Sequence, residues 1–170
     1  IVWQEATGSS SIEGIDKLLL SGNGQAELVG GKECVIRKRP DGKVSFLLDF
    51  GRELQGGIQI VTGQSSRKEA KVRIRFGESV SEAMCDITPE NGATNDHAIR
   101  DFHFTLPWLG VAEIGNSGFR FVRIDVEEPD IDLLLKEVRA TFGYRDIPYL
   151  GSFKSDNDRL NNIWMTGAYT

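Results

Sequence analysis

The sequence predicts an all-β fold, an antiparallel β-sandwich of jelly-roll type followed by one short C-terminal helix. Apolar and polar residues alternate with a period of two over most of the chain, which is typical of strands that bury one face. Glycine-rich turns separate these stretches, and the period of an amphipathic helix is found only from Ser155 onward. Several short strands without intervening helices favour two packed antiparallel sheets over a parallel α/β sheet.

Two strands are expected on either side of a tight turn in the first part of the chain. Pro40-Asp41-Gly42 separates residues 33–39 from the alternating stretch 44–50, and Asp-Gly supplies the positive φ angles of a hairpin turn. We therefore expect these two strands to pair with each other. Upstream, Ser21-Gly22-Asn23-Gly24 predicts a turn, because it lacks the third glycine and the βαβ context of a dinucleotide site.

Further strands follow in the middle and last part of the chain. Residues 54–62 form a strand-like run in which Gly56-Gly57 predicts a bulge, a bend or the close approach of another backbone. The clearest strand covers residues 71–76, where apolar residues alternate with basic ones. Two more stretches alternate in the same way, residues 102–106 and residues 134–144.

One strand departs from simple alternation, and one segment lacks it. In residues 119–124 the apolar phase shifts between Phe121 and Val122, which predicts either a bulge or burial on both faces. The polar segment 78–95 is expected to be a surface loop with one short turn of helix at residues 80–84.

The last stretch of the chain has the pattern of a helix start. Ser155 and Asp158 match a capping box, and Leu160, Ile163 and Trp164 form an apolar stripe. No glycine, proline or basic last turn ends this helix, and its stripe needs a surface to pack on. We therefore expect this chain to be one piece of a larger protein.

Composition and charge exclude several classes of protein. The 170 residues include 25 acidic and 20 basic ones, a net charge of −5 without basic clusters, which argues against nucleic acid as a partner. No apolar run approaches the length of a membrane span, so no membrane partner is expected. The N-terminal residues have neither the basic stretch nor the apolar run of a signal peptide, so the compartment stays open.

Motifs for cofactors and catalysis are missing from the sequence. Two cysteines and two histidines, His97 and His103, do not have the spacing of a metal site, and we expect no metal and no cofactor. There is no Gly-x-Ser-x-Gly elbow and no activated cysteine, so no residue is assigned a catalytic role.

Candidate binding residues come from the chemistry of sugars, which offer flat C–H faces and hydroxyl groups. Exposed Trp and Tyr side chains beside polar groups suit such ligands. Trp108 lies where a strand becomes a loop, and Asp96 and His97 lie in a polar loop. We name Trp108, Asp96 and His97 as candidate substrate-binding residues, against the alternatives of a Trp that closes the core and of a solvated loop cap. Trp3 and Trp164 are assigned to packing.

Three motifs together resemble the bacterial alpha-L-rhamnosidase family. Their residues are Leu48-Asp49-Phe50-Gly51-Arg52-Glu53 with Gly56-Gly57, then Gly118-Phe119-Arg120-Phe121-Val122-Arg123-Ile124, then Gly151-Ser152-Phe153-Lys154-Ser155-Asp156 with Leu160-Asn161-Asn162-Ile163-Trp164. Their order and spacing fit the family over roughly residues 44–170. One departure is Phe121, where the family has Tyr.

The resemblance implies a role for each part of the chain. The first two motifs would belong to a non-catalytic, accessory β-sandwich domain at residues 1–150. The third, at residues 151–170, would begin the helical α/α barrel domain that houses the active site and continues beyond this chain. The parent protein would be an exported bacterial enzyme that hydrolyses terminal alpha-L-rhamnosyl linkages with inversion, using a general acid and a general base. Both carboxylates would lie beyond Thr170. The implied partners are rhamnose-containing glycans and, within the parent enzyme, the barrel on which the sandwich packs.

Two other functions remain open from the residues. The chain could be an autonomous carbohydrate-binding module that holds glycans through Trp108 and neighbouring polar groups. It could instead be a purely structural domain whose apolar face buries the stripe of Leu160, Ile163 and Trp164.

Overall fold

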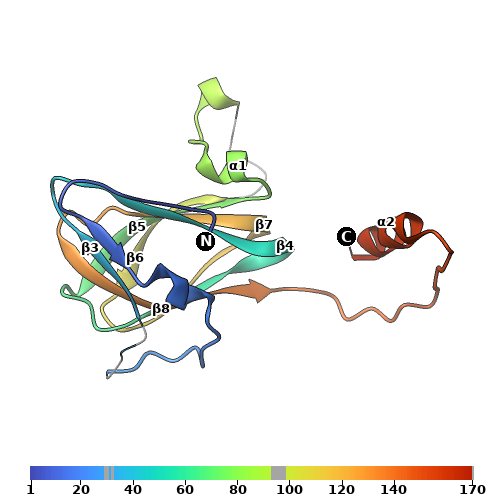
Figure 1. Cartoon of the computed structure of the whole chain (residues 1–170), viewed down its shortest axis with the longest axis horizontal. Coiled ribbons are helices and arrows are strands. Elements are labelled where there is room, and N and C mark those ends of the chain that lie inside the picture. Colours follow the sequence, from blue (N-terminus) through green and yellow to red (C-terminus); the bar gives the residue numbers. More distant parts are fainter. Residues whose placement is uncertain (29–30, 32, 93–98, 170) are drawn as a thin grey trace.

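The computed structural model describes residues 1–28, 31, 33–92 and 99–169 and shows a β-rich body with an extended tail that ends in a helix (Figure 1). The elements in chain order are β1 Trp3–Ala6, β2 Ser11–Glu13, the 3-10 turn η1 Ile15–Leu19, β3 Cys34–Lys38, β4 Val44–Thr62, β5 Glu69–Gly77, α1 Val80–Met84, the 3-10 turn η2 Pro89–Asn91, β6 Asp101–Pro107, β7 Gly110–Val126, β8 Ile131–Phe142 and α2 Asp158–Tyr169.

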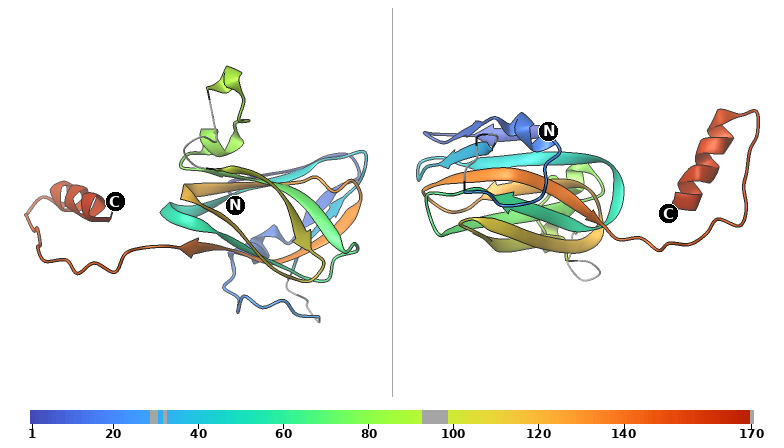
Figure 2. Two further views of the ribbon diagram at one scale, coloured as in Figure 1. Left: turned by 180° about the vertical axis from the view of Figure 1, so that it is seen from behind. Right: turned by 90° about the horizontal axis from the view of Figure 1, so that it is seen from below.

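Two long bent strands, β4 and β7, contribute to both layers of an antiparallel sandwich (Figure 2). Residues 44–49 of β4 pair with β1 and with the second half of β7, which also pairs with β5. Residues 54–62 of β4 pair with the first half of β7 and with β8. β6 extends the first layer beside β5, and β3 and β2 extend the second beside β8. The predicted antiparallel β-sandwich with a C-terminal helix is therefore confirmed.

The bend in β4 uses the glycine pair that predicted it. The register between β4 and β7 shifts between Asp49 and Leu54, and again between Gly56 and Ile58. Gly56 has φ of 148°, and a Cβ there would stand 1.9 Å from the Thr141 carbonyl oxygen. Only glycine can adopt this conformation at this separation, so the predicted close backbone approach is confirmed.

The predicted pairing across Pro40-Asp41-Gly42 is wrong. β3 pairs with β2 and β8, whereas β4 pairs with β1, β7 and β8, so the turn crosses from one layer to the other. The segment around Ser9 holds this turn, because the Asp41 carboxylate accepts hydrogen bonds from the backbone N–H and the hydroxyl of Ser9, both at 3.0 Å. A Cβ on Gly42 would lie 1.9 Å from the Thr7 carbonyl oxygen, which explains the glycine.

The core lies between the two layers and is dense in aromatic residues. Phe76 and Phe119 are buried and meet edge to face, with ring centroids 5.0 Å apart. Val122 packs into this core, and Phe121 packs on the opposite side of β7 against Leu47 and Ala83. The register is continuous at Phe121 and Val122. Of the two explanations for the shifted phase of this strand, burial on both faces is therefore the right one.

The predicted short helix α1 covers that second apolar cluster. The hydroxyl of Ser79 accepts a hydrogen bond from the Glu82 N–H at 3.2 Å and caps the helix. Beyond α1, the buried Arg75 holds Asp86 at 2.9 Å and Asp125 at 2.8 Å. Burial raises the pKa of Asp125, but hydrogen bonds from Ser45 and the nearby arginines outweigh it and hold the pKa below its ordinary value.

The C-terminal helix begins two residues later than the predicted cap. The Asn157 side-chain oxygen accepts hydrogen bonds from the N–H groups of Arg159 at 3.0 Å and Leu160 at 3.3 Å, so Asn157 is the N-cap residue. Ser155 instead bonds to Asn161, whose Oδ1 accepts from the Ser155 N–H at 2.8 Å. Among the described residues, no helix has the length and apolar character to cross a bilayer.

Candidate functional site

The connection between β6 and β7 creates a pocket at one edge of the sandwich. Within the described residues, β6 pairs with β5 alone and the first half of β7 pairs with β4 alone, so two strand edges face each other without pairing. Trp108 and Leu109 span the corner between them. The pocket in this corner, here called the Trp108 pocket, has a volume of about 540 Å³. Its lining residues are Lys68, Glu69, Phe104, Thr105, Leu106, Pro107, Trp108, Val111, Ala112 and Glu113.

A buried hydroxyl holds the corner that carries Trp108. Thr62 is fully buried, and its hydroxyl donates to the Pro107 carbonyl at 3.0 Å and accepts from the Gly110 N–H at 3.0 Å. The Ser65 N–H donates to the Trp108 carbonyl at 3.2 Å. These bonds lie on both sides of Trp108, so its backbone is fixed before any ligand arrives.

The loop between β4 and β5 is fastened to the start of β8. The Ser66 N–H donates to the Asp132 carbonyl at 2.9 Å, and the Asp132 N–H donates back to the Ser66 hydroxyl at 2.8 Å. Arg67 pairs with Asp130 at 3.7 Å and with Glu128 at 4.0 Å, so its charge is matched within the protein.

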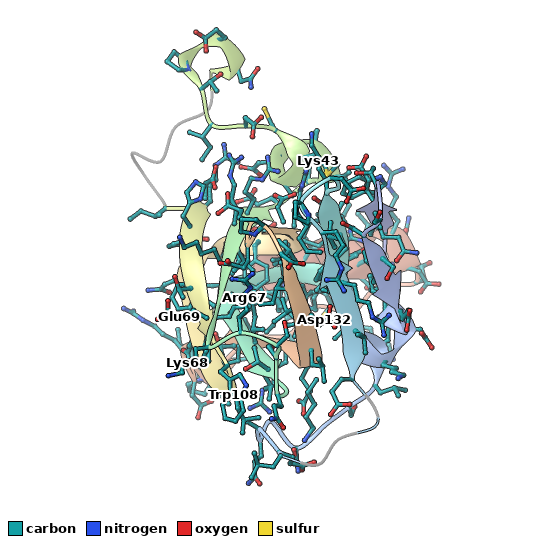
Figure 3. The ribbon with its side chains drawn as sticks, turned by 90° about the vertical axis from the view of Figure 1, so that its left-hand side faces the viewer. Lys43, Arg67, Lys68, Glu69, Trp108 and Asp132 are labelled. Atoms are coloured by element: carbon teal, nitrogen blue, oxygen red, sulfur yellow. The ribbon has the colours of Figure 1, made fainter. Side chains whose placement is uncertain are left out.

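Two charged side chains beside Trp108 have no such partners. Lys68 and Glu69 are exposed, and neither makes an ion pair or a side-chain hydrogen bond within the part of the chain that the structure describes. Glu113, further along the pocket, accepts a hydrogen bond from Gln59 at 2.9 Å. Figure 3 shows Lys68, Glu69 and Trp108 close together on one end of the sandwich, with Arg67 beside them.

The arrangement combines an apolar surface with a donor and an acceptor. Trp108 is 38% exposed, and Val111 is exposed beside it. An ammonium group donates hydrogen bonds and a carboxylate accepts them, so Lys68 and Glu69 offer both functions at the rim. Such a site suits a ligand with an apolar face and several hydroxyl groups.

The predicted site residues have different outcomes. Trp108 is 38% exposed and lines the Trp108 pocket, and its role in binding sugar stays a prediction. Asp96 and His97 lie outside the described residues, and their role stays a prediction. Within the residues that are described, no group of His, Cys, Asp and Glu is placed to hold a metal ion. Burial raises the pKa of the Cys34 thiol to about 11, so this thiol stays protonated at neutral pH.

Sequence analysis missed Lys68 and Glu69. Their proximity to Trp108 depends on the strand register, in which Glu69 pairs with Pro107. The sequence does place both residues between a Gly-Gln-Ser-Ser loop and a predicted strand, which is a common position for binding residues. It does not show that the loop containing Trp108 lies beside them.

A second hollow, of about 390 Å³, lies at another edge of the sandwich beside η1 and is here called the η1 opening. Leu18 of η1 is buried between the layers, and Leu19 and Leu20 stand exposed at the mouth. Residues 21–27 form a strap over β8. The Glu137 carboxylate accepts a hydrogen bond from the Gly24 N–H at 2.9 Å, and the Lys136 ammonium donates one to the Gln25 carbonyl at 2.8 Å.

The strap contains the glycines of the predicted turn. A Cβ on Gly22 would lie 1.9 Å from a carboxylate oxygen of Glu137, and one on Gly24 would lie 1.9 Å from the Arg139 guanidinium. These glycines therefore let the strap lie directly on the side chains of β8.

Comparison with known proteins supports the fold. No protein-family model and no curated protein matches the chain. A fucose binding module of Streptococcus pneumoniae, SpX-3, is similar over 84% of this chain and 95% of the module, with a TM-score of 0.51 and 16% identity. A rhamnosidase from Klebsiella oxytoca with rhamnose bound is similar over 69% of this chain, with a TM-score of 0.44 and 17% identity, and the chain spans 22% of that protein. At these identities the similarity to SpX-3 establishes the β-sandwich fold.

Proposed function

We propose that this β-sandwich is a non-catalytic carbohydrate-binding module and that the Trp108 pocket holds the sugar. The observation that carries the proposal is an exposed indole, on a turn held by Thr62 and Ser65, beside Lys68 and Glu69, whose side chains have no partners within the described part of the chain. The similarity in fold to a fucose binding module is consistent with this function.

In this proposal the sugar stacks its C–H face on Trp108 and directs its hydroxyl groups to the rim. Lys68 donates to sugar oxygens, and Glu69 accepts from sugar hydroxyls. The fixed backbone of the turn lowers the ordering cost of binding, because neither the turn nor its neighbouring loop has to fold around the ligand.

The identity of the glycan and of the parent protein is a finer proposal. We infer that the ligand belongs to a rhamnose-containing glycan and that the parent is a rhamnosidase-like glycoside hydrolase. The support is the order of the three motifs and the apolar stripe of α2, in which Leu160 and Ile163 are exposed. In this division, residues 1–150 are the accessory sandwich and residues 151–170 begin a helical domain. The chain itself then carries no catalytic carboxylates, and it should not turn over an aryl rhamnoside.

Binding is tested by following the indole N–H resonance of Trp108 in NMR titrations with rhamnose, fucose and galactose. We expect at least one sugar to shift this resonance at about millimolar concentration. Trp108→Ala should abolish binding measured by calorimetry, and the charge-removing pair Lys68→Ala and Glu69→Gln should weaken it. Leu19→Ala, which alters the other opening, is the matched control and should bind normally. If no sugar or rhamnose-containing oligosaccharide moves the Trp108 resonance, the function proposed for this pocket is wrong.

A further inference from the structure

The end of α2 contacts the sandwich through one aromatic side chain. The Tyr169 hydroxyl donates to the Glu53 carbonyl at 2.6 Å, and the Arg52 guanidinium carbon lies 3.8 Å from the centre of the Tyr169 ring. Phe142 stacks against the same ring, with centroids 6.4 Å apart and planes 19° apart. A hydrogen bond, a cation–π contact and a ring contact therefore converge on one residue.

The surface that receives Tyr169 is built from two strands. Arg52 and Glu53 lie in the bend of β4, where Gly51 has φ of 83°, and Phe142 is the last residue of β8. The bend breaks the ladder between β4 and β7, since the register shifts between Asp49 and Leu54. Because the ladder is broken here, backbone groups of the bend can bond to other partners, and the Glu53 carbonyl accepts a hydrogen bond from the Tyr169 hydroxyl.

The rest of α2 and the segment that joins it to β8, residues 143–157 and here called the tether, are mostly exposed. Leu150 in the tether is 96% exposed, and Ile163 and Met165 of α2 are more than half exposed. Figure 1 shows α2 beyond one end of the sandwich, with its C-terminal end toward β4. The tether alone would let the helix take many positions, so the contacts of Tyr169 are what favour this one.

We propose that Arg52, Glu53 and Phe142 form a docking surface for the end of α2, and that Tyr169 is the anchor that sets the position of the helix against the sandwich. The docked and released states exchange, and the anchor shifts their populations toward the docked state. This proposal does not depend on sugar binding.

The docking surface lies at the far end of the sandwich from the Trp108 pocket. Leu54 and Thr62 belong to one strand segment, and the rise per residue separates them by about 26 Å. Docking of α2 therefore positions this helix without covering the pocket, whose residues Lys68, Glu69 and Trp108 are labelled in Figure 3.

The test is a distance distribution measured by pulsed electron spin resonance between labels at Gln64 and Asn162, both exposed, in the whole chain with Cys85→Ser. We expect a narrow distribution in the reference protein. Tyr169→Ala should raise the ratio of released to docked molecules about tenfold, and Tyr169→Phe should raise it about threefold, because it removes the hydroxyl and keeps the ring. Arg52→Ala should raise the ratio, and the Arg52→Ala and Tyr169→Ala effects should not add.

Tyr149→Phe is the matched control. The Tyr149 hydroxyl donates to the Ala168 carbonyl at 2.9 Å, within the tether and helix, and it does not contact the docking surface. We expect this variant to keep the narrow distribution. The proposal is overturned if the distance distribution of the reference protein is as broad as that of Tyr169→Ala. It is also overturned if Tyr149→Phe broadens the distribution as much as Tyr169→Phe does. Circular dichroism of each variant checks that α2 and the sandwich are folded.

Discussion

The two openings of the sandwich share a geometry and differ in what occupies them. At both, the strands of the two layers part and expose the edge of the core. At the η1 opening, Leu18 enters the gap and the strap of residues 21–27 is fastened to β8 through Glu137 and Lys136. At the Trp108 pocket, the hydrogen bonds of Thr62 hold the backbone of the turn, and the exposed side chains of Lys68 and Glu69 have no partners among the described residues.

The η1 opening is closed by contacts that stabilise the fold, whereas the Trp108 pocket exposes side chains that can bind a ligand. Satisfied charges and a buried leucine lower the free energy of the folded chain. The ammonium of Lys68 and the carboxylate of Glu69, which have no partner in the part of the chain that is described, contribute little to folding, but together with the exposed face of Trp108 they can contact a ligand. Substitutions at the η1 opening should therefore affect stability, and substitutions of side chains at the Trp108 pocket should affect binding.

The largest effect is expected from truncating the residue that fills the η1 opening. Leu18→Ala should lower the free energy of unfolding by about 3 kcal/mol, because it removes a buried side chain and leaves a cavity. Trp108→Ala should lower it by less, because Trp108 is 38% exposed and lies outside the buried core that contains Leu18. Urea unfolding of both variants measures the contrast. Equal losses of stability would mean that Trp108 is a core residue and that the two openings do not differ in this way.

Thr62 is an exception, because it lies at the Trp108 pocket but stabilises the fold. Thr62→Val should cost about 2 kcal/mol, since the Gly110 N–H and the Pro107 carbonyl lose their partner. Thr62→Ser keeps the hydroxyl and should restore most of this stability. Hydrogen exchange at Gly110 should accelerate in the valine variant alone. Unchanged exchange there would show that the turn is rigid without the hydroxyl.

How far the sequence predicts this molecule depends on the range of each interaction. The strand at residues 71–76 and the bulge at Gly56-Gly57 are local patterns, and the structure confirms them. The alternation fails at Arg75, which was expected to face water and is buried against Asp86 and Asp125. At Phe121 the sequence left a bulge and burial on both faces open, and the structure shows the second.

The pairing predicted across Asp41-Gly42 is wrong, because a turn motif shows that the chain reverses but not which strands pair on either side of it. Here the carboxylate of Asp41 bonds to Ser9, which is distant in sequence.

The candidate site shows the same limit. Trp108 could be found because it follows a predicted strand at a Pro-Trp-Leu-Gly corner. Lys68 and Glu69 could not, because they reach Trp108 through the pairing of Glu69 with Pro107, which is set by the packing of three strands. Asp96 and His97 stay predictions, since they fall outside the described residues.

Matched glycines at the two openings test a smaller effect. Gly22→Ala places a Cβ 1.9 Å from the buried Glu137 carboxylate, so the strap must shift and the variant should lose about 1 kcal/mol. Gly110→Ala places a Cβ 3.2 Å from Pro107, a contact that a small movement relieves, and should lose less than about 0.5 kcal/mol. Thermal unfolding measures both. A larger loss for Gly110→Ala would contradict the idea that the strap lies more tightly on the sandwich than the turn does.

The smallest effect is the response of the strap to acid. Hydrogen bonds from Asn23 and Lys136, together with the positive charge of Lys136, hold the pKa of Glu27 below its ordinary value of 4.5. Because the folded-state pKa is lowered, the stabilisation by Glu27 is complete above pH 4.5 and disappears as the pH falls through the lowered value. Amide chemical shifts of residues 23–27 should therefore move in this acid range, and Glu27→Gln should remove that response. If the amide shifts of the strap residues in the glutamine variant still change with pH as before, Glu27 does not control the acid response of the strap.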